Sequence, residues 1–338
     1  MNTVTRSPLS LELNAARLAT KAPFRISGYV LDGCDAITVR LREAGMEGRG
    51  EAEGVYYHHE NARTMIAQIR AVQDEIVHGA GRAQLLELLP AGGARNALDC
   101  ALWDLEAKRA GKPVWELAGI PKPRPLLTTF TIGAGEPEVM AARAREWSDA
   151  SELKLKLTGD DADAERVRAV RGARPDAWLM VDANQGFTPD TFHTLLPVLV
   201  ETRVQLIEQP FPIGREVDMD GLNSPICIAA DESIQDHLDL DKVTGRFDLI
   251  NIKLDKCGGL TEALRTAAEA RRRGLGLMVG NMGGTSLAMA PAFMLGQLCD
   301  VNDLDGPLQF VNDPPPNVRY TQGQVDCPET VWGAPTST

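Results

Sequence analysis

The chain has 338 residues, 43% of them hydrophobic and 24% charged, and a formal net charge of −12 at pH 7. This length fits one barrel domain plus a second domain, and the negative charge disfavours nucleic acid as a partner. The six cysteines show no CxxC and no metal-ligand spacing. No apolar run of about 18 residues occurs, and no apolar stretch follows a basic start, so we expect a soluble cytoplasmic protein without a membrane partner.

The first 122 residues predict a domain of their own. Short alternating segments, of which ITVRLR is the clearest, favour strands at 8–20, 24–31, 35–42 and 49–54. Apolar stripes at helical spacing favour helices at 60–78, 82–89 and 94–110. A run of strands followed by a run of helices is typical of an α+β domain, which we expect over residues 1–122.

From residue 123 onward, apolar strand-like runs alternate with helix-like segments such as 136–148, 161–173 and 261–273. This alternation predicts an α/β fold, a (β/α)8-type barrel over residues 123–306 with the first domain as its cap. The Pro- and Gly-rich tail, 307–338, is expected to run back against the cap. The predicted barrel strands are 126–132, 152–157, 178–183, 204–208, 226–230, 248–253, 276–280 and 298–304.

Five ionisable residues follow successive barrel strands. Asp182, Glu208 and Asp231 stand in LMVDAN, QLIEQP and IAADES, and Lys156 and Lys253 extend the series, each 22 to 26 residues from the next. One strand, one helix and two short loops take about 25 residues, so these side chains should meet at the carboxyl-terminal mouth of the barrel. Any one of the acids alone could simply cap the following helix. Three in phase, flanked by lysines that are costly to bury, favour an active site.

The three acids predict a site for a hard divalent cation. Carboxylate oxygens suit Mg²⁺ or Mn²⁺, and no His or Cys stands at the matching strand ends, which disfavours Zn²⁺. Lys154 and Lys156 alternate on one strand and share a face, while Lys253 comes from a strand about opposite in the ring. One base on each face of a substrate carbon would allow racemisation or epimerisation.

A further acidic pair, Asp303 and Asp305, ends the eighth predicted strand in VNDLDGP. Alternation places both on one face, where they could bind a cation such as an α-ammonium group. An ordinary Asp/Asn/Gly turn would explain the same residues equally well.

The segments KLK, VDAN, IEQP, ADES and NIKLDKCGG, in this order, resemble the enolase superfamily in its muconate lactonizing subgroup. GGARNALDCALWDLEAKRAG, NIKLDKCGGLTEAL and DLDGP resemble the dipeptide epimerase family, and the resemblance covers nearly the whole chain. It implies an enolase-like fold whose cap covers the barrel mouth with loops near 18–30 and 54–60. It also implies one Mg²⁺ per active site, held by the three in-phase acids, and a homo-oligomer. The implied metal ligands are Asp182, Glu208 and Asp231, and the implied catalytic residues are Lys156, Lys253 and the supporting Lys154.

By the same resemblance, the substrate is a dipeptide, L-Ala-D/L-Glu or another, whose C-terminal α-carbon is inverted by two-base proton transfer through a metal-stabilised enediolate. The acidic pair would hold its α-ammonium group. The family's capping-loop arginine is not matched, since Arg25 comes too early in register and Gly28 or Tyr29 stands in its place. The implied substrate-binding residues are Asp303, Asp305, Thr129, Thr131, Tyr29 and Met282.

Three alternatives remain open from the sequence. The same core serves cycloisomerases and lyases, such as o-succinylbenzoate synthase or muconate cycloisomerase. N-Acylamino acid racemases use it as well, but their substrates lack an ammonium group, as do those of the lyases. A non-catalytic barrel that only binds a ligand is the third alternative, and the complete set of five ionisable residues disfavours it.

Overall fold

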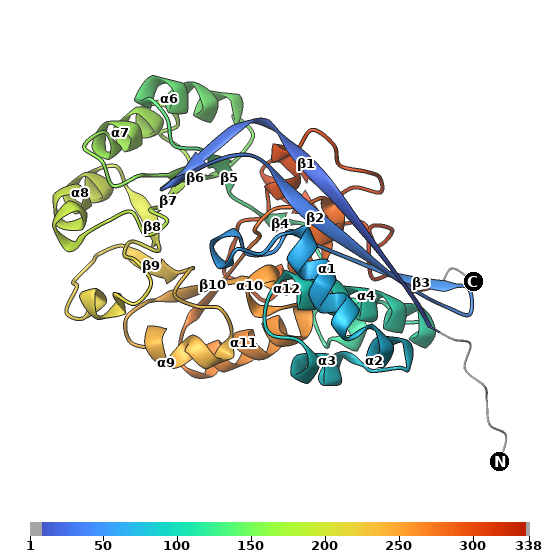
Figure 1. Cartoon of the computed structure of the whole chain (residues 1–338). Coiled ribbons are helices and arrows are strands. Elements are labelled where there is room, and N and C mark those ends of the chain that lie inside the picture. Colours follow the sequence, from blue (N-terminus) through green and yellow to red (C-terminus); the bar gives the residue numbers. More distant parts are fainter. Residues whose placement is uncertain (1–8, 336–338) are drawn as a thin grey trace, which may run out of the picture.

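The structure, a computed structural model, describes residues 9–335 (Figure 1). The chain opens with an antiparallel sheet of β1 (Ser10–Ile26), β2 (Tyr29–Glu43) and β3 (Met46–Ala52). The turn of the β1–β2 hairpin falls inside the predicted strand 24–31, which is therefore wrong, and the predicted residue 8 lies outside the described range. Helices then follow, namely η1 (Tyr56–His58), α1 (Ala62–Ala71), α2 (Gln73–Val77), α3 (Arg82–Leu88), α4 (Gly93–Ala110) and α5 (Val114–Leu117).

Eight parallel strands, paired in chain order from β5 to β12, form the second sheet. The Thr129 amide donates to the Asn302 carbonyl at 2.9 Å and joins the two ends of the curled sheet. The predicted fold class, an α/β barrel-type sheet with an antiparallel cap, is confirmed. The strands are β5 (Phe130–Ile132), β6 (Glu152–Lys156), β7 (Trp178–Asp182), β8 (Val204–Glu208), β9 (Cys227–Ala230), β10 (Leu249–Lys253), β11 (Gly276–Gly280) and β12 (Val301–Asn302).

Helices connect most of these strands, although β8 and β9 are joined by the 3₁₀ turn η2 (Glu216–Met219) instead of a full helix. A smaller sheet contains β4 (Leu126–Leu127), β13 (Arg319–Thr321) and β14 (Gln324–Asp326). The connecting elements are α6 (Pro137–Glu146), α7 (Asp163–Ala173), α8 (Pro189–Glu201), η3 (His237–Asp239), α9 (Leu240–Val243), α10 (Leu254–Cys257), α11 (Leu260–Arg272), α12 (Ser286–Gly296) and η4 (Gly306–Gln309).

Two predicted barrel strands are shorter than expected. The first, 126–132, is broken because Leu126 and Leu127 pair antiparallel with β14 and leave the barrel. The eighth, 298–304, loses its start because Leu298 and Cys299 donate backbone hydrogen bonds back to Leu295 and Gly296 and so continue the turn of α12. Within residues 9–335, no helix combines the length and apolar character needed to cross a membrane.

The cap lies over the barrel mouth (Figure 1). Hydrogen bonds between distant segments hold it there. The hairpin crosses toward β6, and its Arg25 carbonyl accepts from the Ala134 amide at 3.0 Å. The loop after β3 is fixed where the Gly54 amide donates to Asp255 Oδ1 at 2.8 Å. The tail packs against α4, where Trp332 Nε1 donates to the Cys100 carbonyl at 3.2 Å. These contacts close a chamber above the strand ends.

Candidate active site

Three carboxylates meet at the carboxyl ends of β7, β8 and β9. Parallel register pairs Lys156 with Asp182 and Asp182 with Glu208, so their side chains emerge next to one another. Asp182, Glu208 and Asp231 each offer an oxygen within 4.8 Å of the other two. All three are buried, and their donor set contains oxygen alone, which suits a hard divalent cation such as Mg²⁺ or Mn²⁺.

Lysine side chains surround this carboxylate trio. Lys154 is only 1% exposed and lies 2.6 Å from Glu208 Oε2 and 3.0 Å from Asp182 Oδ2. Lys156 Nζ donates to the same Asp182 Oδ2 at 2.6 Å. Lys253 Nζ donates to Asp231 Oδ2, also at 2.6 Å. Every lysine that the sequence placed at this site therefore contacts the trio.

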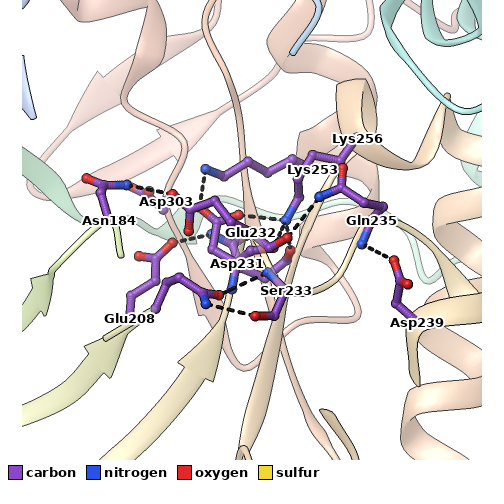
Figure 2. Close-up of polar contacts among 12 residues, drawn as sticks. Asn184, Glu208, Asp231, Glu232, Ser233, Gln235, Asp239, Lys253, Lys256 and Asp303 are labelled. Carbon is purple, nitrogen blue, oxygen red and sulfur yellow. Dashed lines mark hydrogen bonds and ion pairs between the residues drawn. The ribbon is translucent and has the colours of Figure 1, made fainter. Parts of the chain in front are cut away.

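Two residues that the sequence did not single out complete the trio's outer contacts. Lys256, in the short helix α10, donates to Asp231 Oδ1 at 2.6 Å. Asn251, on β10, donates to Glu208 Oε1 at 2.8 Å. Figure 2 shows Lys253 and Lys256 together beside Asp231, with Glu208 close by. In the sequence, the one signal for Asn251 and Lys256 is that both stand close to Lys253 in NIKLDK.

The lysines act unevenly on the three carboxylates of the trio. Burial works against ionisation of Asp182, but Lys156 and Lys154 outweigh it and lower the pKa of Asp182 to about 2. At Glu208 the balance is reversed, because burial and the charge of Asp182 raise its pKa to about 8. Among the described residues, no donor reaches Glu208 Oε2 in hydrogen-bonding geometry, although Lys154 is within ion-pair distance. A bound divalent cation would give Glu208 Oε2 a partner and favour the ionised form of Glu208.

A cavity extends from the trio to the underside of the cap. Asp303 and Asp305 line it from the end of β12, and Thr131 lines it from β5. Asp305 is held by the Thr131 amide at 2.7 Å and by Thr131 Oγ1 at 3.2 Å. Asp303 accepts from Lys154 Nζ at 2.7 Å. The acidic pair therefore faces the cavity as buried carboxylates.

The structure places the other candidate substrate-binding residues differently. Met282 lines the cavity. Thr129 is fully buried, and its hydroxyl donates to Asp303 Oδ1 at 2.7 Å. Tyr29 is 48% exposed, stacks edge-on against Tyr56 and contributes to a separate surface hollow. Neither Thr129 nor Tyr29 is among the residues that line the cavity, and their role in substrate binding stays a prediction.

The cap supplies cavity walls that the sequence did not predict residue by residue. Tyr56 and Tyr57 come from the loop 54–60, which was expected to cover the mouth. Leu31, Cys34 and Glu53 come from β2 and from the end of β3. Sequence spacing alone could not reveal these three, because it carries no information about how the hairpin sits on the barrel.

Comparison with known families assigns both halves of the chain. Residues 11–119 match the mandelate racemase / muconate lactonizing enzyme N-terminal domain. Residues 139–330 match the family described as enolase C-terminal domain-like. These matches agree with the resemblance that the motifs indicated.

Two curated relatives match over most of their length. The L-Ala-D/L-Glu epimerase of Escherichia coli K12 is 38% identical, over 90% of this chain and 95% of the relative. An N-acetyl-D-glutamate racemase of a Pseudoalteromonas species is 36% identical, over 86% of this chain and 93% of the relative. The first name refers to a dipeptide, and the second refers to an N-acetylated amino acid.

Solved structures show the same likeness. An Agrobacterium tumefaciens enolase family member with bound sodium and L-Ala-L-Glu is 40% identical, with a TM-score of 0.93 over 96% of this chain and all of that one. A dipeptide epimerase of Methylococcus capsulatus, complexed with Mg and L-Arg-D-Lys, is 30% identical, with a TM-score of 0.86 over 95% of this chain and 97% of that one.

The central position of Lys154 leads to a stability prediction. Lys154→Met should destabilise the metal-free protein by about 3 kcal/mol, because it leaves three buried carboxylates without their shared cation. Chemical denaturation in EDTA measures this change in the free energy of unfolding. Lys112→Met is the control, since Lys112 pairs with Glu116 at the surface, and it should change stability by less than about 0.5 kcal/mol. Equal stability of the two variants would contradict the charge balance described above.

Proposed function

This chain belongs to the mandelate racemase / muconate lactonizing enzyme family, and we propose that it is a magnesium-dependent dipeptide epimerase. One observation carries the proposal. Lys156 on β6 and Lys253 on β10 stand four strands apart in a ring of eight, so they approach the cavity from opposite sides with the trio between them. Two bases on opposite sides of one carbon suit inversion of its configuration.

Asp182, Glu208 and Asp231 would hold the Mg²⁺, and Mn²⁺ could take its place. The bound ion would neutralise the negative charge that develops on the substrate carboxylate when the α-proton leaves. Asp231 lines the cavity, and Asp182 and Glu208 each have an oxygen within 4.8 Å of an Asp231 oxygen. The substrate carboxylate would therefore bind at this end of the cavity. The α-carbon would then sit between the two lysines.

The two lysines would perform the proton transfers. One lysine, as a free amine, takes the α-proton, and the electrons of the C–H bond pass into the carboxylate to give an enediolate. The other lysine, as an ammonium ion, donates a proton to the opposite face, and the α-carbon is inverted. Asn184 Oδ1 accepts from Lys156 Nζ at 3.0 Å, which helps to orient that amine. Lys154 neutralises the carboxylates beside it.

The acidic pair supports a dipeptide as the substrate. Burial and the charge of Asp303 raise the pKa of Asp305 to about 6. Asp303 is already paired with Lys154, whereas the contacts to Asp305 from Thr131 and Gln309 come from neutral groups. A dipeptide α-ammonium group would supply the missing positive charge to Asp305.

An N-acylamino acid racemase remains the second candidate, favoured by the likeness to the Pseudoalteromonas enzyme. Such a substrate has no ammonium group and would leave Asp305 without a cationic partner. The cycloisomerase and lyase alternatives share this difficulty. They also have no need for a second lysine on the opposite face.

Single substitutions of the two lysines test the mechanism. Lys156→Ala should block α-proton exchange from one epimer and Lys253→Ala from the other, because each amine reaches one face. Epimerisation should fall by about 10²–10⁴-fold or more in either variant. ¹H NMR of each pure epimer in D₂O measures both quantities.

Lys242→Ala is the matched control, because Lys242 is exposed and pairs with the neighbouring Asp239. This variant should show α-proton exchange and epimerisation at the wild-type rates. Near wild-type epimerisation by Lys253→Ala would mean that one base suffices and would contradict the two-base mechanism.

Metal removal and ligand substitution test the cofactor. EDTA should abolish turnover, and Mg²⁺ should restore it. Asp182→Asn, Glu208→Gln and Asp231→Asn should each weaken Mg²⁺ binding by at least about tenfold in calorimetry, since each removes a charged oxygen ligand. Asp161→Asn, at an exposed position after β6, should bind Mg²⁺ normally. A trio variant with wild-type affinity would remove that residue from the set of ligands.

Asp305→Asn tests the substrate class. It should lower kcat/KM for a dipeptide by about 10–100-fold, because a buried charge-assisted contact is lost. The N-acetyl derivative of the same C-terminal amino acid serves as the control substrate and should be affected by less than a few-fold. Equal losses on both substrates would show that Asp305 does not recognise an ammonium group.

A further inference from the structure

A carboxylate from the cap enters the cavity without a partner for one of its oxygens. Glu53 follows the end of β3 and lines the same cavity as the two lysines. Its Oε2 is buried, and no donor in the described part of the chain, residues 9–335, makes a hydrogen bond to it. The oxygen occupies the space that a Cβ atom at position 283 would fill, so the glycine there makes room for it. A buried acceptor left unpaired is unfavourable unless a ligand supplies the donor.

The charge around Glu53 also favours a positively charged partner. Burial and the nearby charge of Asp255 raise the pKa of Glu53 to about 8. The polar neighbour of the carboxylate is the Cys34 thiol, a weak donor. Lys253 and Arg17 attract it only over a distance, and Lys253 already donates to Asp231. A cation placed against Glu53 would therefore gain a strong, desolvated ion pair.

The rest of the cap wall suits an aliphatic chain that leads to that cation. Leu31, Tyr56, Tyr57 and Phe310 present carbon surface to the cavity. No arginine of residues 9–335 lines it, and its three lysines all contact carboxylates on the barrel side. The acidic cap residue thus stands at the end of a largely apolar wall.

The proposed reaction decides which part of the substrate meets this wall. The trio takes the carboxylate, the lysines reach the α-hydrogen from either face, and Asp305 draws the peptide nitrogen side toward β12. The remaining substituent of the α-carbon is its side chain, which points away from the barrel floor and toward the cap. It is this side chain that Glu53 would contact.

We propose that Glu53 makes the enzyme selective for dipeptides whose epimerised residue carries a cationic side chain, an ammonium or guanidinium group on an aliphatic stem. This inference rests on the proposed dipeptide epimerase activity. A glutamate side chain at the same place would bring a second carboxylate against Glu53. An apolar side chain would cover Oε2 without offering it a donor. Both should be poorer substrates than lysine or arginine.

The test compares L-Ala-L-Lys, L-Ala-L-norleucine and L-Ala-L-Glu in the Mg²⁺-loaded enzyme. Norleucine has the lysine stem without its ammonium group, so the ratio of the two kcat/KM values isolates the charge. We expect wild type to favour the lysine dipeptide over both others by at least about tenfold. Glu53→Gln keeps the shape of the side chain and removes its charge. This variant should reduce the lysine-to-norleucine ratio of kcat/KM by at least about tenfold. Its kcat/KM for the norleucine dipeptide should be at least that of wild type.

Glu47→Gln is the matched control, since Glu47 lies on β3 and pairs with Arg40 and Arg42 away from the cavity. It makes the same exchange of a glutamate for a glutamine and should keep the wild-type ratio. The inference is overturned if wild type prefers the norleucine or glutamate dipeptide, or if Glu53→Gln keeps the ratio. It is also overturned if Glu53→Gln lowers kcat/KM equally for all three dipeptides, which would indicate a structural role. Absence of epimerisation of any dipeptide by wild type would refute the proposed function instead.

Discussion

The buried charge at the barrel mouth must be balanced within the protein, and the rest of the site depends on this constraint. Parallel register brings Lys156, Asp182 and Glu208 into adjacent positions, where water cannot separate their charges. Like charges this close are tolerated only when opposite charges interleave with them. Lys154 meets that need by contacting acids from three strands, β7, β8 and the end of β12. The residues that would carry out catalysis are thus also the residues that keep the mouth stable.

The sequence revealed most of the barrel because its signal is local. A strand buried on both faces is a short apolar run, and β8 spans Val204–Glu208, the range predicted for it. The side chain just after such a run must emerge at the mouth, so spacing alone located the carboxylate trio. Where the signal was not local, the prediction was wrong. Leu126 and Leu127 look like the start of a barrel strand, but β14, almost 200 residues later, pairs with them.

The cavity walls supplied by the cap could not be predicted for the same reason. Their place depends on a few contacts between distant segments, such as the Thr285 amide donating to Glu51 at 2.7 Å. That contact sets β3 against the loop after β11 and so directs Glu53, two residues later, toward Gly283. Nothing in the local sequence of Glu53 distinguishes it from a surface acid. Lys256 is a similar case, because only the turn of α10 returns its amine to Asp231.

The trio with its lysines and the cap residues that line the cavity are held in place by different contacts. Substrate selectivity can therefore change without a change in the proton-transfer chemistry. The trio and its lysines are fixed by strand register and by one another, so changing any of them disturbs all the others. Glu53 makes no hydrogen bond to the trio or its lysines and is positioned by the docking of β3. A substitution at Glu53 or at Gly283 can therefore change what the cavity accepts while the barrel floor keeps its charge balance. Side-chain preference in this chain is in that sense a property of the cap, and proton transfer is a property of the barrel.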